Sequence, residues 1–447
     1  MNETPIHVHI GSGRLGLGLI GDVATDCNTP VVMFNREGSD PRHLKLGKSK
    51  LYMVQSRTGE KLVKLHEYFL YSSDLGRNGP TSLGEWISNP LVRLLTTATG
   101  IENFETMKDT ARAVWSGLSN RINRGVVEPL FIVAAENMPG NSIGLYDAVL
   151  DLACANYGYN KERLDKELKR SHAHFLPCVV DRICTTIDAS SDPVRVMVGE
   201  YKQWAINVSS IPKEDRYAIE FLRKSEAVRL VDEQRIFELY EKRKAWCLNG
   251  IHIASATFAY AHDPPIERLS EALKDQGILK SVRDVQKEFG LALYFTAHDA
   301  NDPEFSLDNI IKFNDSVLER FQSAVDDPAW RILRNLVHEN APKNITEAMR
   351  GTRKKLTDLK AIQDPAVLMG AQNTLIFELV GKTVQETELG EFFRKIKWRI
   401  LEPIEQLFPY DQKHEASIRL LVRLLQVIDY QLDVFYSNLV NLKISSE

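Results

Sequence analysis

A short apolar strand that runs directly into closely spaced glycines constrains the fold of this 447-residue chain more than any other feature. Ile6 to Ile10 has the length of a strand, and Gly11-x-Gly13-x-x-Gly16 follows it at once. A helix-compatible apolar run then continues to Ala24, and a second strand-like run covers Pro30 to Phe34. The order strand, glycine turn, helix, strand predicts a βαβ unit with parallel strands.

The spacing of the three glycines indicates a site for a dinucleotide. In such a turn the first glycine makes the bend, the second lets a pyrophosphate approach the backbone, and the third lets the helix pack on the strand. The positive end of the helix dipole then faces the phosphate. A purely structural turn is the alternative, but strands on both sides favour binding. We therefore assign the phosphate-binding turn to Gly11, Gly13, Arg14, Leu15 and Gly16.

The residues at the end of the second strand bear on the choice of cofactor. The acid that usually grips the adenosine ribose is replaced by Asn35-Arg36. Asn35 has no carboxylate to repel a 2′-phosphate, and Arg36 is a suitable charge-assisted donor to one. Alternatively, Glu37 holds the ribose and Arg36 is an ordinary loop residue. We expect NAD or NADP as cofactor, with NADP favoured.

Later segments extend the pattern to two domains. Leu91 to Leu95 and Leu130 to Ala135 have strand length, and Phe175 to Ile187 and Val194 to Val208 are extended in character. From about Glu214 onward the apolar residues recur at helical spacing, as in Ile219, Leu222 and Leu230. We expect an α/β protein, with a Rossmann-type doubly wound sheet in residues 1–212 and a mainly α-helical substrate and catalytic domain in residues 213–447.

Composition excludes several classes of function. The formal net charge of −4 supplies no basic field for nucleic acid or anionic membrane. We find neither a signal peptide nor a membrane span, so we expect a cytoplasmic protein with a small-molecule partner. The five cysteines include no C-x-x-C pair, so we predict neither a disulfide framework nor a zinc knuckle, and we assign no metal-binding residue. The oligomeric state stays open.

Lys244, Asn249 and His252 form the segment that carries chemistry. On an α-helix at about 100° per residue, Asn249 lies roughly 140° and His252 roughly 80° round from Lys244, so all three share one broad face. A metal-independent alcohol dehydrogenase needs a base for the hydroxyl proton and neutral donors for the alkoxide. Lysine serves as that base if burial lowers its pKa. The alternative is a surface lysine beside two packing residues.

Two loops that follow predicted strands favour the catalytic interpretation. The carboxyl ends of strands line the ligand crevice of an open α/β sheet. Asn137 is therefore placed to be a second oxyanion donor, and Thr97 and Gly100 are placed to contact the cofactor.

These motifs resemble the polyol-specific long-chain dehydrogenases, the mannitol dehydrogenase family. Lys244, Asn249 and His252 match its K-x-x-x-x-N-x-x-H signature, and the chain from Glu136 to Asn141 is similar to its D-N-L-P-x-N loop. Val180-Asp181-Arg182-Ile183 and Trp204 are similar to two further motifs. The resemblance implies a Rossmann domain and a helical domain with the active site between them, a lysine base, an Asn137 and Asn249 oxyanion pair, and no catalytic metal. It also implies substrate-binding roles for Asn141, Asp181 and Arg182.

The departures from the family pattern bear on the substrate. Asn207-Val208 replaces an acidic pair after the tryptophan motif, which puts hydroxyl recognition in doubt. The glycine-rich loop and Glu319-Arg320-Phe321-Gln322 are more similar to the family members that act on hexitol phosphates. We therefore expect NAD(P)-dependent interconversion of a hexitol or hexitol phosphate and its ketose. A free-polyol or uronate dehydrogenase and a non-catalytic dinucleotide sensor are the alternatives.

Overall fold

The chain forms two compact units, Met1–Tyr240 and Glu241–Glu447, and each is described by itself. The computed structural model describes residues 4–38, 40–71, 83–99, 104–136, 140–261, 266–297 and 300–323. The boundary falls later than residue 212, where the apolar spacing suggested it. Strand β13 (Val228–Val231) still pairs with β12 (Gln203–Asn207) and so belongs to the first unit.

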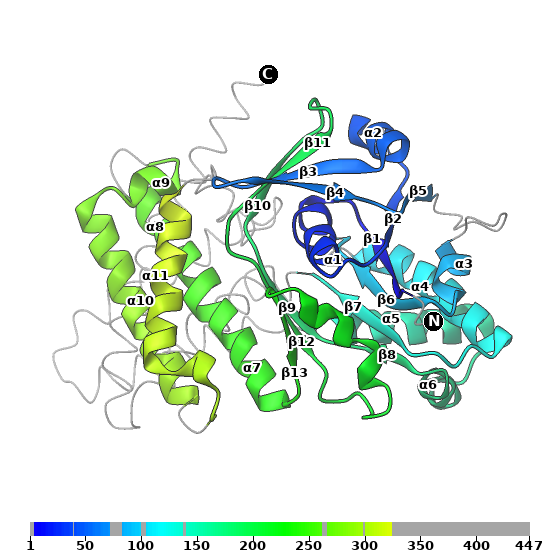
Figure 1. The fold of residues 1–447 in the computed structure, drawn as a ribbon. Helices are drawn as coiled ribbons and strands as arrows, with labels where there is room; N and C mark the ends of the chain where they lie inside the picture. Colours follow the sequence, from blue (N-terminus) through cyan, green and yellow to red (C-terminus); the bar gives the residue numbers. More distant parts are fainter. Residues whose placement is uncertain are drawn as a thin grey trace, which may run out of the picture. The chain divides into compact units, whose positions relative to one another are not determined.

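A six-stranded parallel sheet forms the centre of the first unit, in the order β5-β2-β1-β6-β7-β8 (Figure 1). In chain order of these strands the arrangement is 3-2-1-4-5-6, the Rossmann order. The expected strands at β1, β2, β6 and β7 are confirmed, while β5 was not foreseen. The strands are β1 (Ile6–Ile10), β2 (Val31–Arg36), β5 (Glu67–Tyr71), β6 (Val92–Thr97), β7 (Leu130–Ala134) and β8 (Ala173–Phe175).

Both faces of this sheet are buried, which explains its nearly continuous apolar strands. In β7, Ile132 packs with the helices α3 to α6, whereas Phe131 and Val133 belong to a second cluster with η1 and α1. The sheet is therefore doubly wound, as expected. The helices are η1 (Gly16–Gly21), α1 (Asp22–Asp26), α2 (Pro41–Ser49), α3 (Leu83–Ser88), α4 (Phe104–Arg124), α5 (Asn141–Tyr157), α6 (Lys161–Arg170) and α7 (Gln234–Arg243).

Two smaller sheets complete the first unit. One has the order β10-β11-β3-β4 and the other β13-β12-β9. The extended segments expected at 175–187 and 194–208 are confirmed as β9 to β12, but the β3 and β4 pair was not foreseen. Leu230, which we assigned to helical spacing, lies in β13, and Leu222 lies in the short helix η3. The remaining elements are β3 (Leu51–Gln55), β4 (Glu60–Lys64), β9 (Cys178–Asp181), β10 (Cys184–Asp188), β11 (Val194–Val198), η2 (Arg216–Ala218) and η3 (Glu220–Lys224).

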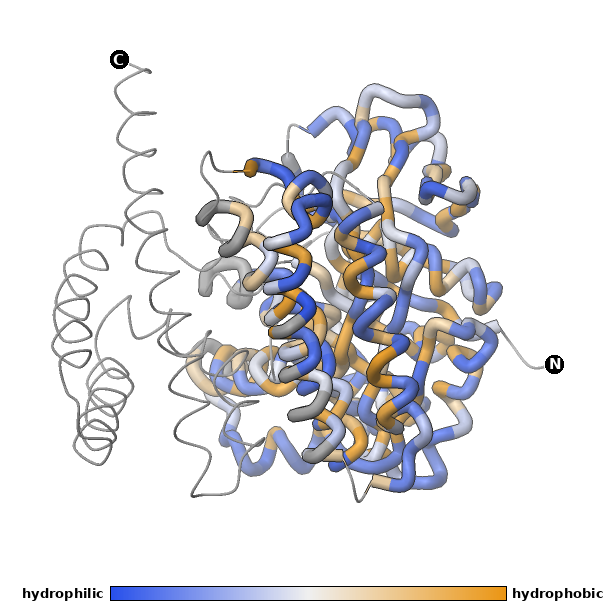
Figure 2. Tube along the Cα trace, turned by 90° about the vertical axis from the view of Figure 1, so that its left-hand side faces the viewer, coloured by the Kyte–Doolittle hydropathy of each residue, from blue (hydrophilic) through white to orange (hydrophobic). Residues whose placement is uncertain are grey.

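The described part of the second unit is helical, as expected. Along the tube in Figure 2, hydrophobic positions recur between hydrophilic ones on the helices, which is typical of helices with one buried face. In α11, for example, Ile310, Val317 and Phe321 are buried. No described helix is long and apolar enough to cross a membrane. The helices are η4 (Lys244–Gly250), α8 (Ile251–Ala261), α9 (Leu269–Ala272), α10 (Gln276–Ala297), η5 (Pro303–Phe305) and α11 (Leu307–Gln322).

Candidate functional site

The three glycines of the turn after β1 differ in what surrounds them. Gly11 has a φ of +113°, and a Cβ there would lie 2.4 Å from the carbonyl oxygen of Ala98. A Cβ on Gly16 would lie 2.0 Å from the carbonyl oxygen of Gly11. A Cβ on Gly13 would meet nothing within 4 Å. Gly11 and Gly16 are thus required by the fold itself, whereas Gly13 leaves open space of the kind a pyrophosphate needs.

Two buried histidines fix the backbone of this turn. His9 Nε2 lies 2.7 Å from the carbonyl oxygen of Gly11, and His9 Nδ1 lies 2.6 Å from Thr96 Oγ1. The carbonyl only accepts, so His9 carries its proton on Nε2, and Nδ1 accepts from the Thr96 hydroxyl. Thr96 Oγ1 in turn accepts from His7 Nε2, 2.7 Å away. Burial lowers the pKa of His9 to about 4, so the neutral ring demanded by these bonds is the stable one.

The segment after the turn is not the α-helix that we expected but a π-helix, η1, which leads into α1. Its glycines let other side chains reach its backbone. Tyr52 Oη donates to the carbonyl oxygen of Leu17 at 2.9 Å, and a Cβ on Gly21 would lie 1.9 Å from the same Oη. Arg182 Nη1 donates to the carbonyl oxygen of Gly18 at 2.5 Å. These side-chain donors satisfy carbonyls of the irregular helix, as buried backbone groups require.

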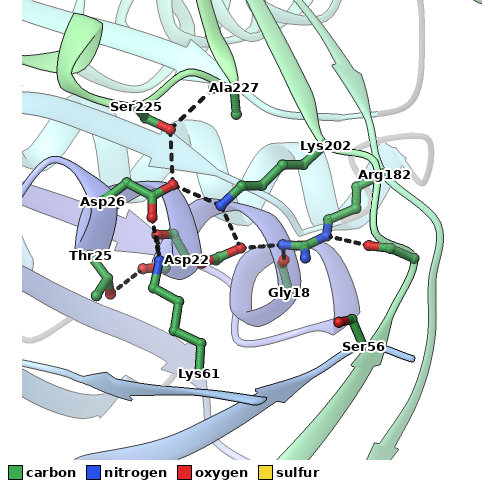
Figure 3. Close-up of polar contacts among 12 residues, drawn as sticks. Gly18, Asp22, Thr25, Asp26, Ser56, Lys61, Arg182, Lys202, Ser225 and Ala227 are labelled. Atoms are coloured by element: carbon green, nitrogen blue, oxygen red, sulfur yellow. Dashed lines mark hydrogen bonds and ion pairs between the residues drawn. The ribbon is translucent and has the colours of Figure 1, made fainter. Parts of the chain in front are cut away.

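Asp22, the first residue of α1, is paired with three cations, as Figure 3 shows. The side chain of Asp22, only 3% exposed, pairs with Lys61 Nζ at 2.5 Å, with Lys202 Nζ at 2.9 Å and with Arg182 Nη1. Burial alone would raise the pKa of Asp22, but the three cations outweigh it and lower the pKa to about 2. The network ties α1 to β4 and to the segments before β10 and β12. The network therefore fixes the helical segment that follows the glycine turn.

Four polar side chains close a ring beside the turn, where the ribose was expected. Asn35 Oδ1 accepts from the backbone nitrogen of Ser12 at 2.9 Å, and Asn35 Nδ2 donates to His43 Nε2 at 3.3 Å. His43 Nδ1 then donates to Tyr68 Oη at 2.6 Å, and the hydroxyls of Tyr68 and Ser12 share a hydrogen bond of 3.0 Å. Asn35, near the end of β2, thus positions the turn. Ser12, His43 and Tyr68 were missed because they are far apart in the sequence.

Arg36, the candidate for a 2′-phosphate, is half-exposed and paired. Its Nη1 lies 3.0 Å from Asp109 Oδ2 in α4, and Asp109 also pairs with Arg112 at 3.3 Å. Glu37 beside it is exposed. The arginine is therefore at the surface next to the Asn35 ring, but its charge is partly neutralised. Both interpretations of the cofactor remain open.

The ends of β6 and β7 are joined by a carboxylate that sequence analysis did not single out. Glu136 Oε1 accepts from the backbone nitrogen of Thr99 at 2.7 Å and from Thr97 Oγ1 at 3.4 Å. Thr97 is completely buried. Arg14 of the glycine turn is exposed, and its Nη1 donates to the carbonyl oxygen of Thr185 at 3.0 Å. The predicted contacts Gly100 and Asn137 lie outside the described residues. Glu136 thus orders the strand ends that flank both of them.

The three residues assigned to substrate binding have internal partners. Asn141 Nδ2 donates to the carbonyl oxygens of Glu136 and Cys178, at 3.1 and 3.0 Å. Asp181 is buried in β9, in register with Gln203 of β12. Arg182 is 5% exposed and takes part in the Asp22 network. In the first unit these side chains therefore support the framework, and their predicted contact with substrate stays a prediction.

The lysine segment in the second unit begins with another π-helix. η4 spans Lys244 to Gly250, so Asn249 does not lie 140° round from Lys244 as we expected for an α-helix. In a π-helix the hydrogen bonds run from residue i to i+5, which brings residues five apart onto one side. Burial agrees with this geometry, because every residue of η4 except Lys244 and Asn249 is buried. π-helical insertions are frequent at functional sites.

Neighbouring side chains fix both ends of this segment. Arg243, 4% exposed, pairs with Glu304 Oε2 at 3.0 Å and lies 4.6 Å above the ring of Phe313. After η4, the ring of His252 stacks on Phe321 of α11, with centroids 4.6 Å apart and 19° between planes. Lys244, Asn249 and His252 are all half-buried. The helix is therefore anchored beside Lys244, and His252 contacts the Glu319 to Gln322 segment noted for its resemblance to phosphate-active enzymes.

Comparison with known proteins places this geometry in a family. The mannitol dehydrogenase Rossmann domain matches residues 5–220. Residues 5–220 are therefore a Rossmann domain of the mannitol dehydrogenase type. This agrees with the strand order and the glycine turn described above, which are those of a dinucleotide-binding domain of an oxidoreductase.

Relatives in the mannitol dehydrogenase family match along much of the chain. A mannitol-1-phosphate 5-dehydrogenase of Geobacillus stearothermophilus is 24% identical over 389 residues, which cover 85% of this chain and 91% of the relative. One of Lactococcus lactis is 26% identical over 339 residues, covering 74% and 78%. The structure of Pseudomonas fluorescens mannitol 2-dehydrogenase, a ternary complex with NAD and D-mannitol, aligns with a TM-score of 0.53 and 14% identity, covering 100% of this chain and 94% of that one. This last likeness concerns the fold.

Proposed function

We propose that this chain is an NAD(P)-dependent dehydrogenase that interconverts a polyol, a hexitol or hexitol phosphate, with its ketose. The observation that carries the proposal is the π-helical segment η4, in which Lys244 and Asn249 lie five residues apart and are the two residues that are not buried. A base and a neutral amide donor on one side of a helix are the groups that proton removal from an alcohol requires. The family relationship supports the same class of reaction.

In this proposal Lys244 is the general base. Its amine takes the proton of the reacting hydroxyl, while the amide of Asn249 donates to the oxygen as negative charge develops. Asn137 is proposed as the second donor. His252, fixed by its stacking on Phe321, holds a neighbouring substrate hydroxyl or passes the proton on. None of these steps requires a catalytic metal.

The cofactor is proposed to bind at the glycine turn of the first unit. The residues fit a dinucleotide, because Gly13 faces open space while Gly11 and Gly16 hold the turn closed beneath it. When bound, the nicotinamide supplies the hydride acceptor. NADP is favoured by the lack of an acid at Asn35 and by Arg36 beside it, although Arg36 must share its charge with Asp109.

We propose a phosphorylated hexitol or ketose as substrate in preference to a free polyol. Three basic residues, Arg182, Lys312 and Arg320, could bind the phosphate, and their surroundings differ. Arg182 is occupied by Asp22, and Lys312 is exposed. Arg320 is half-buried on α11, next to the Phe321 that stacks on His252. We therefore favour Arg320 as the phosphate ligand, and the names of the two relatives support this substrate class.

The test is the ratio of kcat/KM for mannitol 1-phosphate to that for mannitol, measured with NAD and with NADP. A bound phosphate should raise the ratio by about 100-fold or more. The variant Arg320→Ala should reduce the ratio, while Lys312→Ala should leave it unchanged. A ratio near one, or activity only with free polyols or uronates, would reject the phosphate but keep the dehydrogenase. If the protein binds a dinucleotide but turns over none of these substrates, the alternative of a non-catalytic dinucleotide sensor is favoured.

A further inference from the structure

Two histidines and an aspartate of the first unit converge at a place that plays no part in the proposed reaction. His172 Nδ1 lies 2.8 Å from Asp215 Oδ2, and His174 Nε2 lies 2.7 Å from the same oxygen. The three potential ligand atoms lie within 4.8 Å of one another. Imidazole nitrogens and a carboxylate oxygen are the ligands of many divalent transition-metal sites.

The local structure explains why these side chains meet. His172 directly precedes β8 and His174 lies within it, two residues on, and both rings reach the same oxygen. The ring of His174 stacks on Phe131 of the neighbouring strand β7, with centroids 5.7 Å apart, so it projects from the face of the sheet. The loop between β12 and η2 carries Asp215, whose backbone nitrogen bonds the carbonyl oxygen of Pro212 at 3.0 Å. The carboxylate is therefore held in place by a tight turn before η2.

The backbone of His172 takes the left-handed conformation. It has a φ of +51° just after α6 ends. Glycine or asparagine is usual at such a position, and other L-residues there cost on the order of 1 kcal/mol. Histidine is among the non-glycine residues enriched in this conformation, and here its imidazole, 36% exposed, reaches the carboxylate.

We propose that His172, His174 and Asp215 bind Zn²⁺ through the two imidazole nitrogens and one carboxylate oxygen. Tetrahedral zinc with bonds of about 2.0 to 2.2 Å separates its ligand atoms by about 3.3 Å. The hydrogen-bonded pairs at 2.7 and 2.8 Å thus need to open by only a fraction of an ångström. The side chain of Asp215 is 6% exposed and that of His174 14%, so the ion enters past His172 and keeps a position for water.

The place of this site in the sheet defines its role. Ala173 pairs with Leu130, the first residue of β7, so His172 and His174 lie at the amino end of these parallel strands. The glycine turn, Thr97 and Glu136 lie at the carboxyl ends. Bound Zn²⁺ would therefore link the edge strand β8 to the loop of Asp215 without taking part in hydride transfer. Binding of Zn²⁺ is therefore expected to raise the stability of the protein and to leave its turnover unchanged.

The experiment uses the full chain, stripped with a chelator and titrated with Zn²⁺ against a chromophoric competitor. We expect one equivalent to bind and to raise the Tm. His172→Asn keeps the left-handed backbone but removes the ligand, and should weaken binding at least about tenfold and abolish the Tm shift. His66→Gln, a change at an exposed histidine, should behave like the wild type.

Asp215→Asn is the second variant, since it retains one acceptor oxygen, and it should also weaken binding. X-ray absorption of the zinc-loaded protein should show nitrogen and oxygen ligands with two imidazoles. Sulfur ligands would assign the ion to cysteines and overturn the proposal. Absence of stoichiometric binding, or wild-type affinity in both variants, would overturn it too and leave a hydrogen-bonded His-Asp-His group.

Discussion

Lys244 and Asn249 lie five residues apart on the π-helix η4, the spacing at which such a helix brings two residues onto one side. They are also the two residues of the segment that are not buried. The proposed base and the proposed oxyanion donor are thereby presented together. An α-helix would have separated them by about 140°.

The first prediction concerns Asn249. Asn249→Ala should lower kcat by about 100- to 1000-fold, because one donor to the developing oxyanion is lost. Affinity for the cofactor should stay within a few fold of the wild type. Steady-state kinetics with separate cofactor titration measures both quantities. A variant that raises KM and leaves kcat intact would show that Asn249 binds substrate without stabilising the transition state.

The glycine turn offers a test that separates folding from binding. Gly16→Ala should destabilise the protein by about 3 kcal/mol or more, because its Cβ would be forced against the carbonyl oxygen of Gly11. Gly13→Ala should fold normally yet bind dinucleotide more weakly, since its Cβ fills only the open space. Gly144→Ala in α5, where nothing lies within 4 Å, is the matched control. Urea unfolding and cofactor titration distinguish the three. Unchanged affinity in Gly13→Ala would place the pyrophosphate elsewhere.

The pair Arg36 and Asp109 should control the choice of cofactor. Arg36→Ala should lower the ratio of kcat/KM for NADP over NAD by roughly 10-fold or more, because a charge-assisted donor is lost. Asp109→Asn should raise the same ratio, since it frees the guanidinium now held at 3.0 Å. Arg112→Ala, which removes the other partner of Asp109, is the control. If Arg36→Ala leaves the ratio of kcat/KM for NADP over NAD unchanged, the better interpretation is that Glu37 holds the ribose.

His9 should make stability depend on pH. Its pKa is lowered to about 4 in the folded chain, mainly by burial, so between pH 4 and 6.5 the unfolded chain binds more protons. The neutral ring therefore contributes fully above pH 6.5, and about 3 kcal/mol is lost as the pH falls to 4. His9→Gln, which keeps a donor toward Gly11, should reduce this slope in urea unfolding series, whereas His66→Gln should not. Equal slopes in wild type and His9→Gln would contradict the burial of a neutral ring.

Much of the first unit was predictable because its signals are local. The apolar runs of β1, β2, β6 and β7 and the spacing of Gly11, Gly13 and Gly16 each depend on a few consecutive residues. The same is true of the Lys244 signature, which led to the segment that carries the proposed chemistry.

What sequence analysis missed depends on contacts between distant residues or on an irregular backbone. Neither π-helix has a distinct apolar period, so η1 and η4 were expected as ordinary α-helices. The partners of Asp22 come from three separate segments, and no local pattern connects them. Leu230 has an apolar spacing that suits a helix, yet pairing with β12 places it in a strand.

Lys244→Ala tests the proposed lysine base, with Lys242→Ala as a matched control two residues away. We expect Lys244→Ala to lose nearly all turnover of the hexitol or its phosphate, while its affinity for dinucleotide stays within a few fold of the wild type. This split follows because, in the proposed mechanism, the lysine contacts the reacting hydroxyl and not the cofactor. Lys242→Ala should retain wild-type kcat. A fully active Lys244→Ala enzyme would contradict the mechanism.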